Sequence, residues 1–298
     1  MDKKKILDIK TVCECNRCLG CRTLHPQAAL INLENPGVEQ EAVKFEFYAI
    51  LLIEDCVDNC CCCGRRYYDF AYATMVFLTP GEVFRMSKDN TLPGKGLLLA
   101  FDPALLLCTT LGGHIGQYTF FRYRKEEALH LSQRETERVR RYFDDIGAEL
   151  QHDIDTHSRT LLSRLIELLL DYCSRFYERQ FITREEKNKS ILRRLERLVE
   201  ADIDAGRLER RHFPTAAEWA AALGLSEAYF CDLLRFQTGR TPAEYLDIHR
   251  LEAAKRMLQG GEATPAQVAR RLGFADVARF SLLFRKYTGQ TPADYRLN

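Results

Sequence analysis

The hydrophobic positions divide the chain into a β-rich N-terminal part and a helical C-terminal part. The continuous apolar run from Phe45 to Ile53 contains β-branched and aromatic residues, as buried strands do. Met75–Leu78 is followed by the turn residues Thr79-Pro80-Gly81 and by Val83-Phe84, and another apolar run spans Gly96–Phe101. Short strands at this spacing, over residues 1 to about 125, favour a small barrel or sandwich.

A helical pattern begins after Ser132, where Ser132 to Glu135 has the sequence of a helix capping box. Further along, apolar residues recur at helical intervals and form one stripe, which consists of Leu161, Leu165, Leu168, Leu169, Tyr172 and Phe176. This stripe either packs on the strands or forms the seam of a homodimer, and the sequence favours neither. From Ile191 onward the pattern is helical almost throughout.

The C-terminal part contains one sequence pattern twice. Thr241-Pro242 recurs fifty residues later as Thr291-Pro292, whereas Gly224 recurs forty-nine residues later as Gly273. The second copy therefore has one extra residue in its turn. Each copy predicts a short helix, a glycine turn and a second helix, which is the arrangement that places a recognition helix in the DNA major groove.

The segment between the copies supports a DNA-reading function. Ala243 to Gln259 has apolar residues at helical spacing, and about 17 residues at 1.5 Å rise give a rod of roughly 25 Å. Such a rod suits two recognition helices that enter grooves about 34 Å apart, one turn of B-DNA. A helical bundle with a duplicated packing motif is the alternative, and the matching glycines and Thr-Gly-x-Thr-Pro endings favour the DNA reader.

The chain from about residue 190 to its end resembles the DNA-binding domain of the AraC/XylS transcription regulators. The most specific stretch runs from Leu272-Gly273-Phe274 to Thr291-Pro292 and Tyr295. Upstream, residues 67–69, 77–81, 118–121 and 175–185 are similar to regulators of this family from Bacteroidota. The resemblance implies a sequence-specific transcription regulator with a cupin-like N-terminal domain for sensing and dimerisation.

Pattern and resemblance together predict an α+β protein. The expected parts are a cupin-like β-barrel sensory domain at residues 1–130, a helical dimerisation and linker segment at 131–185, and an all-α AraC-type DNA-binding domain with two helix-turn-helix motifs at 186–298.

The resemblance and the helical spacing also give candidate DNA-contacting residues. They are Ser226, Ala228, Tyr229, Cys231, Asp232, Arg235, Val277, Ala278, Arg279, Leu282, Arg285 and Lys286. Arg279 can bond guanine, Asp232 can accept from cytosine N4, and Leu282 can touch a thymine methyl group. Many members of the family have a basic residue at the positions of Asp232 and Leu282. Arg235, Arg285 and Lys286 are expected to contact phosphates or, alternatively, to form a solvated helix face.

The net charge of the chain does not by itself indicate a nucleic-acid partner. The formal net charge of the chain is +1. From Arg211 to the end, 12 Lys and Arg stand against 9 Asp and Glu, which leaves +3. DNA binding is therefore predicted from helix geometry, with little support from the overall electrostatic field.

Twelve cysteines form the second unusual feature. Cys13, Cys15, Cys18 and Cys21 have spacings that suit Zn²⁺, and thiolates also suit Cu(I) or an Fe–S cluster. Cys56 and the run Cys60–Cys63 add five more, although consecutive residues of a strand alternate faces and cannot all reach one metal. Thiols without a function are therefore the favoured alternative. Cys231 could make DNA binding sensitive to oxidation, or could be an incidental small residue.

Enzymatic activity is not expected. The seven histidines include no H-x-H pair, and the sequence has no G-x-S-x-G, Walker or H-E-x-x-H motif. With no signal peptide and no apolar segment of about 20 residues, the protein is expected in the cytoplasm, away from membranes.

The expected partners are double-stranded operator DNA, an unknown small-molecule or metal effector, a second copy of the chain and RNA polymerase. Two other functions remain open: a constitutive dimeric DNA-binding protein, and a thiol, metal or redox-responsive module.

Overall fold

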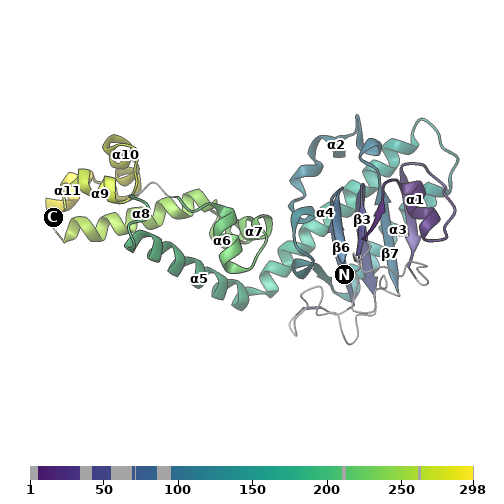
Figure 1. Cartoon of the computed structure of the whole chain (residues 1–298), viewed down its shortest axis with the longest axis horizontal. Coiled ribbons are helices and arrows are strands. Elements are labelled where there is room, and N and C mark those ends of the chain that lie inside the picture. Colours follow the sequence, from purple (N-terminus) through teal and green to yellow (C-terminus); the bar gives the residue numbers. More distant parts are fainter. Residues whose placement is uncertain are drawn as a thin grey trace, which may run out of the picture. The chain divides into compact units, whose positions relative to one another are not determined.

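The chain folds into two compact units, Met1–Arg184 and Glu185–Asn298 (Figure 1). The computed structural model describes residues 6–33, 42–54, 69–70, 72–85, 95–209, 213–260 and 263–297. Among the helices it describes, none combines the length and the apolar character that a membrane span requires.

The strands of the N-terminal unit form two sheets. A three-stranded sheet has the order β1-β3-β6, and a five-stranded antiparallel sheet has the order β2-β7-β4-β5-β8. The strands are β1 (Ile6–Ile9), β2 (Ala28–Asn32), β3 (Ala42–Phe45), β4 (Tyr48–Glu54), β5 (Ala73–Leu78), β6 (Glu82–Arg85), β7 (Gly96–Phe101) and β8 (Leu129–Leu131). Over the described ranges both sheets are open, so the closed cupin-like barrel that the resemblance implies is not found.

The predicted strand over Phe45 to Ile53 is in fact two strands. β3 ends at Phe45 and β4 begins at Tyr48, and the two strands belong to different sheets. Glu46 and Phe47 form the bend between them, and the Phe47 side chain is fully buried. Apolar character thus continues through the bend, which is why the hydrophobic pattern did not reveal the break. The strand at Met75–Leu78, the turn through Gly81 and the strand at Gly96–Phe101 are confirmed.

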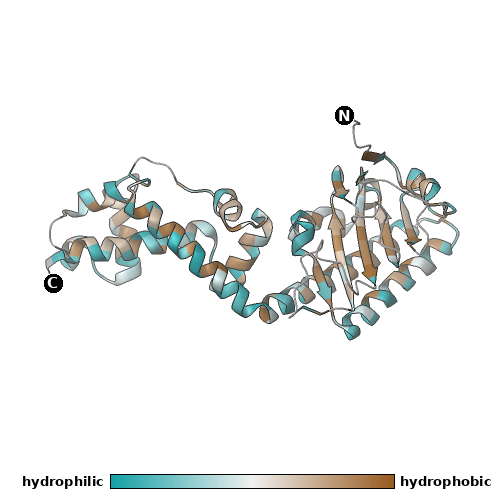
Figure 2. Ribbon diagram, turned by 60° about the horizontal axis from the view of Figure 1, so that its bottom comes forward, coloured by the Kyte–Doolittle hydropathy of each residue, from teal (hydrophilic) through white to brown (hydrophobic). Residues whose placement is uncertain are grey.

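The middle of central strand β4 is buried on both faces. Its residues Ala49 to Ile53 are all between 0% and 3% exposed, so both faces of the strand are covered. Figure 2 shows the strands as predominantly hydrophobic and the helices as amphipathic. The helices of this unit are α1 (Val12–Cys18), α2 (Thr110–His114), α3 (Gln133–Gln151) and α4 (Ser158–Thr183), with short 3₁₀ turns between residues 103 and 127.

Helix α4 packs through a different stripe from the predicted one. Leu161 and Leu168 are 44% and 43% exposed, while Leu169 of the predicted stripe is buried. The buried side of the helix consists of Leu162, Ile166, Leu169, Leu170, Cys173 and Tyr177. The predicted stripe therefore packs within the unit only in part, because Leu161 and Leu168 are exposed while Leu165, Tyr172 and Phe176 are half-buried.

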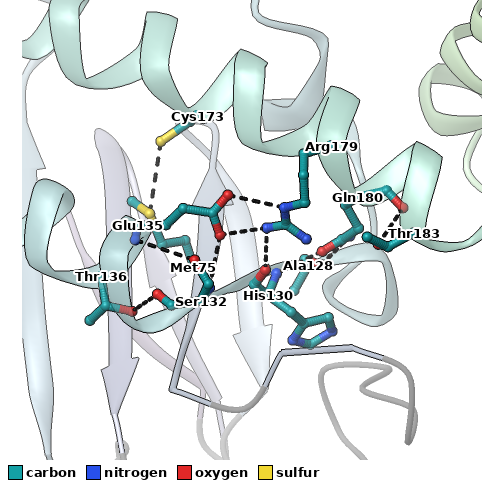
Figure 3. Close-up of polar contacts among 10 residues, drawn as sticks. All are labelled: Met75, Ala128, His130, Ser132, Glu135, Thr136, Cys173, Arg179, Gln180 and Thr183. Carbon is teal, nitrogen blue, oxygen red and sulfur yellow. Dashed lines mark hydrogen bonds and ion pairs between the residues drawn. The ribbon is translucent and has the colours of Figure 1, made fainter.

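A polar network joins the corner between β8 and α3 to α4 (Figure 3). The capping box predicted at Ser132 is present: the Ser132 N–H donates to Glu135 Oε2 at 2.8 Å. Glu135 also accepts two bonds from Arg179, at 3.0 and 2.8 Å, and Arg179 donates to the His130 carbonyl at 2.7 Å. Gln180 donates to the Ala128 carbonyl and accepts from the His130 N–H. These bonds fix one end of α4 to the edge strand β8.

The end of α4 is held by a buried ion pair. Arg184 bonds both carboxylate oxygens of Asp69, at 2.7 and 2.8 Å, and the two side chains are 0% and 1% exposed. Removing one member of such a pair strands a charge in the interior, which costs more than the pair itself contributes.

Arg184→Met should destabilise the N-terminal unit by about 3–5 kcal/mol, because Asp69 is left as a buried charge. Hydrogen exchange of peptides from β4 and β7 reports the opening free energy of this unit alone. Adding Asp69→Leu should restore most of the loss. Arg140→Met, which breaks the pair of the exposed Arg140 with the half-buried Glu54, should cost less, about 1 kcal/mol. Equal losses in Arg184→Met and Arg140→Met would contradict the account.

The C-terminal unit is entirely helical over the residues described. Its helices are α5 (Glu185–Asp204), α6 (Ala216–Leu223), α7 (Glu227–Thr238), α8 (Pro242–Gln259), α9 (Pro265–Arg271), α10 (Val277–Thr288) and α11 (Pro292–Leu297). The mixed class of a sheet-containing part followed by a helical part is thus confirmed.

Candidate nucleic-acid interface

The first predicted helix pair is α6 and α7. Thr215 caps α6 with a reciprocal capping box, and Gly224 ends it in the left-handed conformation, at φ 75°. The Leu225 N–H then returns to the Ala220 carbonyl at 2.8 Å, which closes the turn. Ser226 caps α7 by accepting from the Tyr229 N–H at 3.2 Å. Each boundary is therefore fixed by its own hydrogen bond.

The second pair, α9 and α10, repeats these devices. Thr264 caps α9, Gly273 has φ 71°, and the Phe274 N–H returns to the Ala269 carbonyl at 2.9 Å. Asp276 caps α10 by accepting from the Arg279 N–H at 2.6 Å. The cap follows the turn glycine by three residues here and by two in the first pair, which confirms the extra residue predicted in the second turn.

Gly273 is required for space as well as for conformation. A Cβ atom at this position would lie 2.4 Å from the Leu208 carbonyl oxygen, far inside van der Waals contact. At Gly224, by contrast, a Cβ atom would meet nothing within 4 Å. The second turn is therefore packed against the chain that follows α5, while the first turn is open.

Helix α8 connects the two pairs. Thr241 and Glu244 form its capping box, and Pro242 occupies its first turn. Its 18 residues span roughly 27 Å at 1.5 Å rise, in keeping with the rod predicted from the sequence.

The two faces of α7 separate clearly by burial. The buried side consists of Tyr229, Phe230, Leu233 and Leu234. Tyr229 is 1% exposed, so the structure removes it from the candidate DNA-contacting residues. Ser226 is 8% exposed and acts as the helix cap. Of the other candidates, Ala228, Cys231 and Asp232 are half-buried and Arg235 is exposed.

Helix α10 presents a more open face. Phe280 and Phe284 are fully buried, and they pack against Phe274 and Tyr295 respectively. The exposed side carries all six predicted candidates of this helix, which are Val277, Ala278, Arg279, Leu282, Arg285 and Lys286. Leu282 is 72% exposed, the largest value among the exposed hydrophobic residues described.

Comparison with known proteins identifies this arrangement. The family described as "Helix-turn-helix domain" matches residues 219–298. A putative AraC-like transcription regulator from Streptomyces antibioticus is 33% identical over 85 residues, which cover 28% of each chain. The HTH-type transcriptional activator RhaS from Escherichia coli O9:H4 (strain HS) is 38% identical over 88 residues, which cover 28% of this chain and 32% of RhaS.

Residues 219–298 form an AraC-type helix-turn-helix domain.

The similarity covers less than a third of the length of these curated relatives. Among solved structures, the DNA-binding domain of AdpA, in complex with a target DNA, is 31% identical, covers 33% of this chain and 88% of that chain, and has a TM-score of 0.27. ToxT from Vibrio cholerae is 15% identical and covers 91% of this chain and 96% of that chain, with a TM-score of 0.31.

The AraC-type domain contains one residue that the sequence did not single out, Arg250 of α8. The residue as a whole is 7% exposed. Its guanidinium lies 3.7 Å from the Phe274 ring centroid and 5.4 Å from the Phe213 ring centroid. It donates to the Leu272 carbonyl at 2.8 Å and to Asp247 at 2.7 Å. Arg250 thereby fixes the linker helix to the turn that precedes α10.

A weak signal for Arg250 does exist in the sequence. It stands at an apolar-stripe position of α8, four residues after the buried Leu246 and four before the buried Ala254. Burial lowers the pKa of Arg250 from its ordinary value, and Asp247 acts in the opposite direction. The positive charge of Arg279 also lowers the pKa of Arg250, because the two guanidinium groups line the same pocket.

Arg250→Met should destabilise the AraC-type domain by about 2–3 kcal/mol, because it removes charged hydrogen bonds and both cation–π contacts. Urea unfolding is followed by the fluorescence of Trp219, the single tryptophan, which is buried in α6. Arg256→Met, an exposed position on the same helix, should change the stability by no more than about 0.5 kcal/mol. A small effect of Arg250→Met would show that the guanidinium does not anchor the turn.

The candidate metal ligands do not form a common site. Cys13 is exposed, Cys15 is fully buried, and Cys18 and Cys21 pack partly buried against the core of the N-terminal unit. Within the described part of the chain, no group of three or more His, Cys, Asp or Glu side chains is arranged to hold a metal ion. Cys56 and Cys60–Cys63 lie outside the described residues, as do Tyr67 and Tyr68.

Burial also makes the Cys15 thiol unreactive. It raises the pKa of Cys15 from 9.0 to about 12, with smaller contributions from Cys18 and Cys21. Since the thiolate is both the nucleophile and the metal ligand, Cys15 is poorly prepared for either role in this fold.

Alkylation with iodoacetamide at pH 8 should modify Cys13 much faster than Cys15. The raised pKa alone leaves about a thousandfold less thiolate at Cys15. Peptide mass spectrometry measures each site separately, with the exposed Cys108 as a positive control. In urea the two rates should converge. Equal rates in the native protein would place Cys15 at the surface and restore the four-thiol cluster as a metal site.

Proposed function

We propose that this protein is a sequence-specific DNA-binding transcription regulator, in which the N-terminal unit receives an effector. The AraC-type domain supplies the DNA-reading part. The second helix of each pair begins at an equivalent cap, Ser226 in α7 and Asp276 in α10. Each of these helices has one side outside the core. The relatives that match this domain are a putative AraC-like transcription regulator and a transcriptional activator.

The observation that carries the proposal is the exposed face of α10. Val277 is 42% and Leu282 72% exposed on a helix whose other side is fully buried. Exposed apolar side chains on a well-packed helix are unfavourable in water, but they match the methyl groups of thymine in the major groove. Arg279 lies between them in the sequence, is exposed as well, and can bond guanine O6 and N7.

The remaining candidates fall into proposed base contacts and proposed phosphate contacts. On α7, the half-buried Ala228, Cys231 and Asp232 offer a shallow, mildly acidic reading face, on which Asp232 can accept from cytosine N4. Arg235, Arg285 and Lys286 are exposed beside these faces and are proposed to hold phosphates. In this arrangement the second helix pair provides most of the direct base contacts.

The exposed stripe on α4 supports a dimer in the proposed regulator. Leu161 and Leu168 remain open to solvent in the single chain, although they follow the helical repeat of a packing seam. A second copy of the chain, paired through this stripe, would bury both residues and bring two DNA-reading domains to paired sites on an operator.

Selection of duplexes from a random library tests the proposed function. The full chain should enrich one motif with two conserved segments about 10 base pairs apart, centre to centre, because α8 spaces the two recognition helices. Binding of the enriched duplex is then measured by fluorescence anisotropy at several salt concentrations. Failure to enrich any motif would refute sequence-specific binding.

Arg279→Ala should lose discrimination at one base-pair position of that motif, at a cost of about 1–3 kcal/mol. The reason is that its guanidinium is proposed to bond a single guanine. Affinities for all four base pairs at each position of the motif provide the measurement.

Arg285→Ala is the matched variant for a phosphate contact. It should weaken binding to all sequences alike and reduce the slope of log K against log salt by about 1. A uniform loss in Arg279→Ala as well would assign Arg279 to the phosphate backbone.

A further inference from the structure

A groove between α3 and α4 collects four arginines of the N-terminal unit. It has a volume of about 390 Å³ and is lined by Arg134, Glu135, Arg138, Tyr172, Arg175, Phe176 and Arg179. The volume falls within the range of small-molecule sites, which is roughly 300–1,000 Å³. Two aromatic rings and the stems of the arginines form the walls.

The charge of this groove is poorly compensated. Glu135 is the one carboxylate that lines it, against four guanidinium groups, which leaves a net charge of +3. Arg134, Arg138 and Arg175 form no ion pair with any residue of the described ranges. Like charges held this close repel one another, and a bound anion would relieve the repulsion.

Arg179 provides a fixed wall for the groove. It bonds Glu135 through two nitrogens and the His130 carbonyl through one, as Figure 3 shows. Its side chain is 23% exposed and lines the groove, and its guanidinium also lies 4.8 Å from the Phe70 ring centroid. The ion pair of Arg179 and Glu135 is thus a fixed part of the groove lining.

Tyr172 positions the two central cations. The guanidinium of Arg138 lies 5.3 Å from the Tyr172 ring centroid, and that of Arg175 lies 5.6 Å from it. One arginine comes from α3 and the other from α4, so a single ring holds cations from both helices. Tyr142 packs against the same ring at 5.2 Å and supports it from α3.

We propose that this groove binds a compact organic anion with at least two negative charges, either a phosphate ester or a polycarboxylate. Guanidinium groups recognise both by paired N–H···O bonds in the plane of the fork. Arg138 and Arg175 hold the anion from two sides, and Arg134 adds a third positive charge at the rim. The ligand is the effector of the proposed regulator, a role that rests on the proposed function.

The groove continues the apolar stripe of α4 that carries the proposed dimer seam, because Tyr172 and Phe176 belong to that stripe and also line the groove. The seam residues Leu161 and Leu168 precede Tyr172 along α4, and the groove occupies the following turns, from Tyr172 to Arg179. α4 ends at Thr183, two residues before Glu185, the first residue of the C-terminal unit. An anion that draws α3 and α4 together therefore acts on the helix that leads directly into the DNA-reading part.

Isothermal titration calorimetry of the full chain with pyrophosphate and with citrate, at low salt and without DNA, tests the site. At least one probe should bind with a stoichiometry of one per chain. Arg138→Gln and Arg175→Gln should each weaken binding about tenfold, as the loss of a charged hydrogen bond does. Arg138→Lys keeps the positive charge but loses the paired N–H donors of the guanidinium. Its affinity should lie between those of the original chain and Arg138→Gln.

Arg141→Gln and Arg164→Gln are the matched controls, because both positions are exposed on the same two helices but lie outside the groove. They should leave the affinity within about twofold of the original. Tighter binding of pyrophosphate assigns a phosphate ester, and tighter binding of citrate assigns a polycarboxylate. No saturable binding of either probe, or equal losses in the control variants, would overturn the site.

The effector role has a separate readout. Saturating anion should change the affinity of the original chain for its selected duplex and leave that of the Arg138→Gln/Arg175→Gln variant unchanged. An unchanged DNA affinity in the original chain would overturn the effector role. If no duplex is selected at all, the proposed function fails, while calorimetry still decides whether the groove binds anions.

Discussion

The backbone at the start of each helix is the constraint on which the AraC-type domain depends. A helix leaves its first N–H groups without internal partners, and a capping side chain that accepts one of them stabilises the helix by about 1 kcal/mol. Side chains that accept such a bond stand at the starts of α6 to α11, and they are Thr215, Ser226, Thr241, Thr264, Asp276 and Thr291. The duplication visible in the sequence is largely a duplication of these boundaries.

Fixed boundaries determine which residues of a helix face outward. α7 and α10 begin one residue after their caps, so equivalent positions differ by fifty in number. Phe230 and Phe280 are accordingly both buried. Tyr229 and Arg279, which are also equivalent, are buried and exposed respectively. The two copies thus begin at equivalent positions but present different surfaces, as the proposed reading of two different DNA segments requires.

The sequence predicted most of the helical unit because its signals are local. Caps, turn glycines and Thr-Pro pairs act within a few residues, and the structure confirms the helix pairs and the extra residue in the second turn. The failures involve long-range packing. Phe47 continues an apolar run through a bend, and the stripe predicted on α4 packs only in part, since Leu161 and Leu168 are exposed. Arg250 was missed because its partners Phe213 and Leu272 are brought together only by the fold.

Arginine shows why composition says so little about function in this chain. Arg184 is buried with Asp69 and Arg250 with Asp247 and two aromatic rings, so both are occupied in holding the fold. Arg279 is exposed on α10, and Arg138 and Arg175 are exposed in a groove with one carboxylate. A net charge of +1 counts all of them alike. The charges available to a ligand are those that burial and pairing have left over, and they include Arg279 on α10 and Arg138 and Arg175 in the groove.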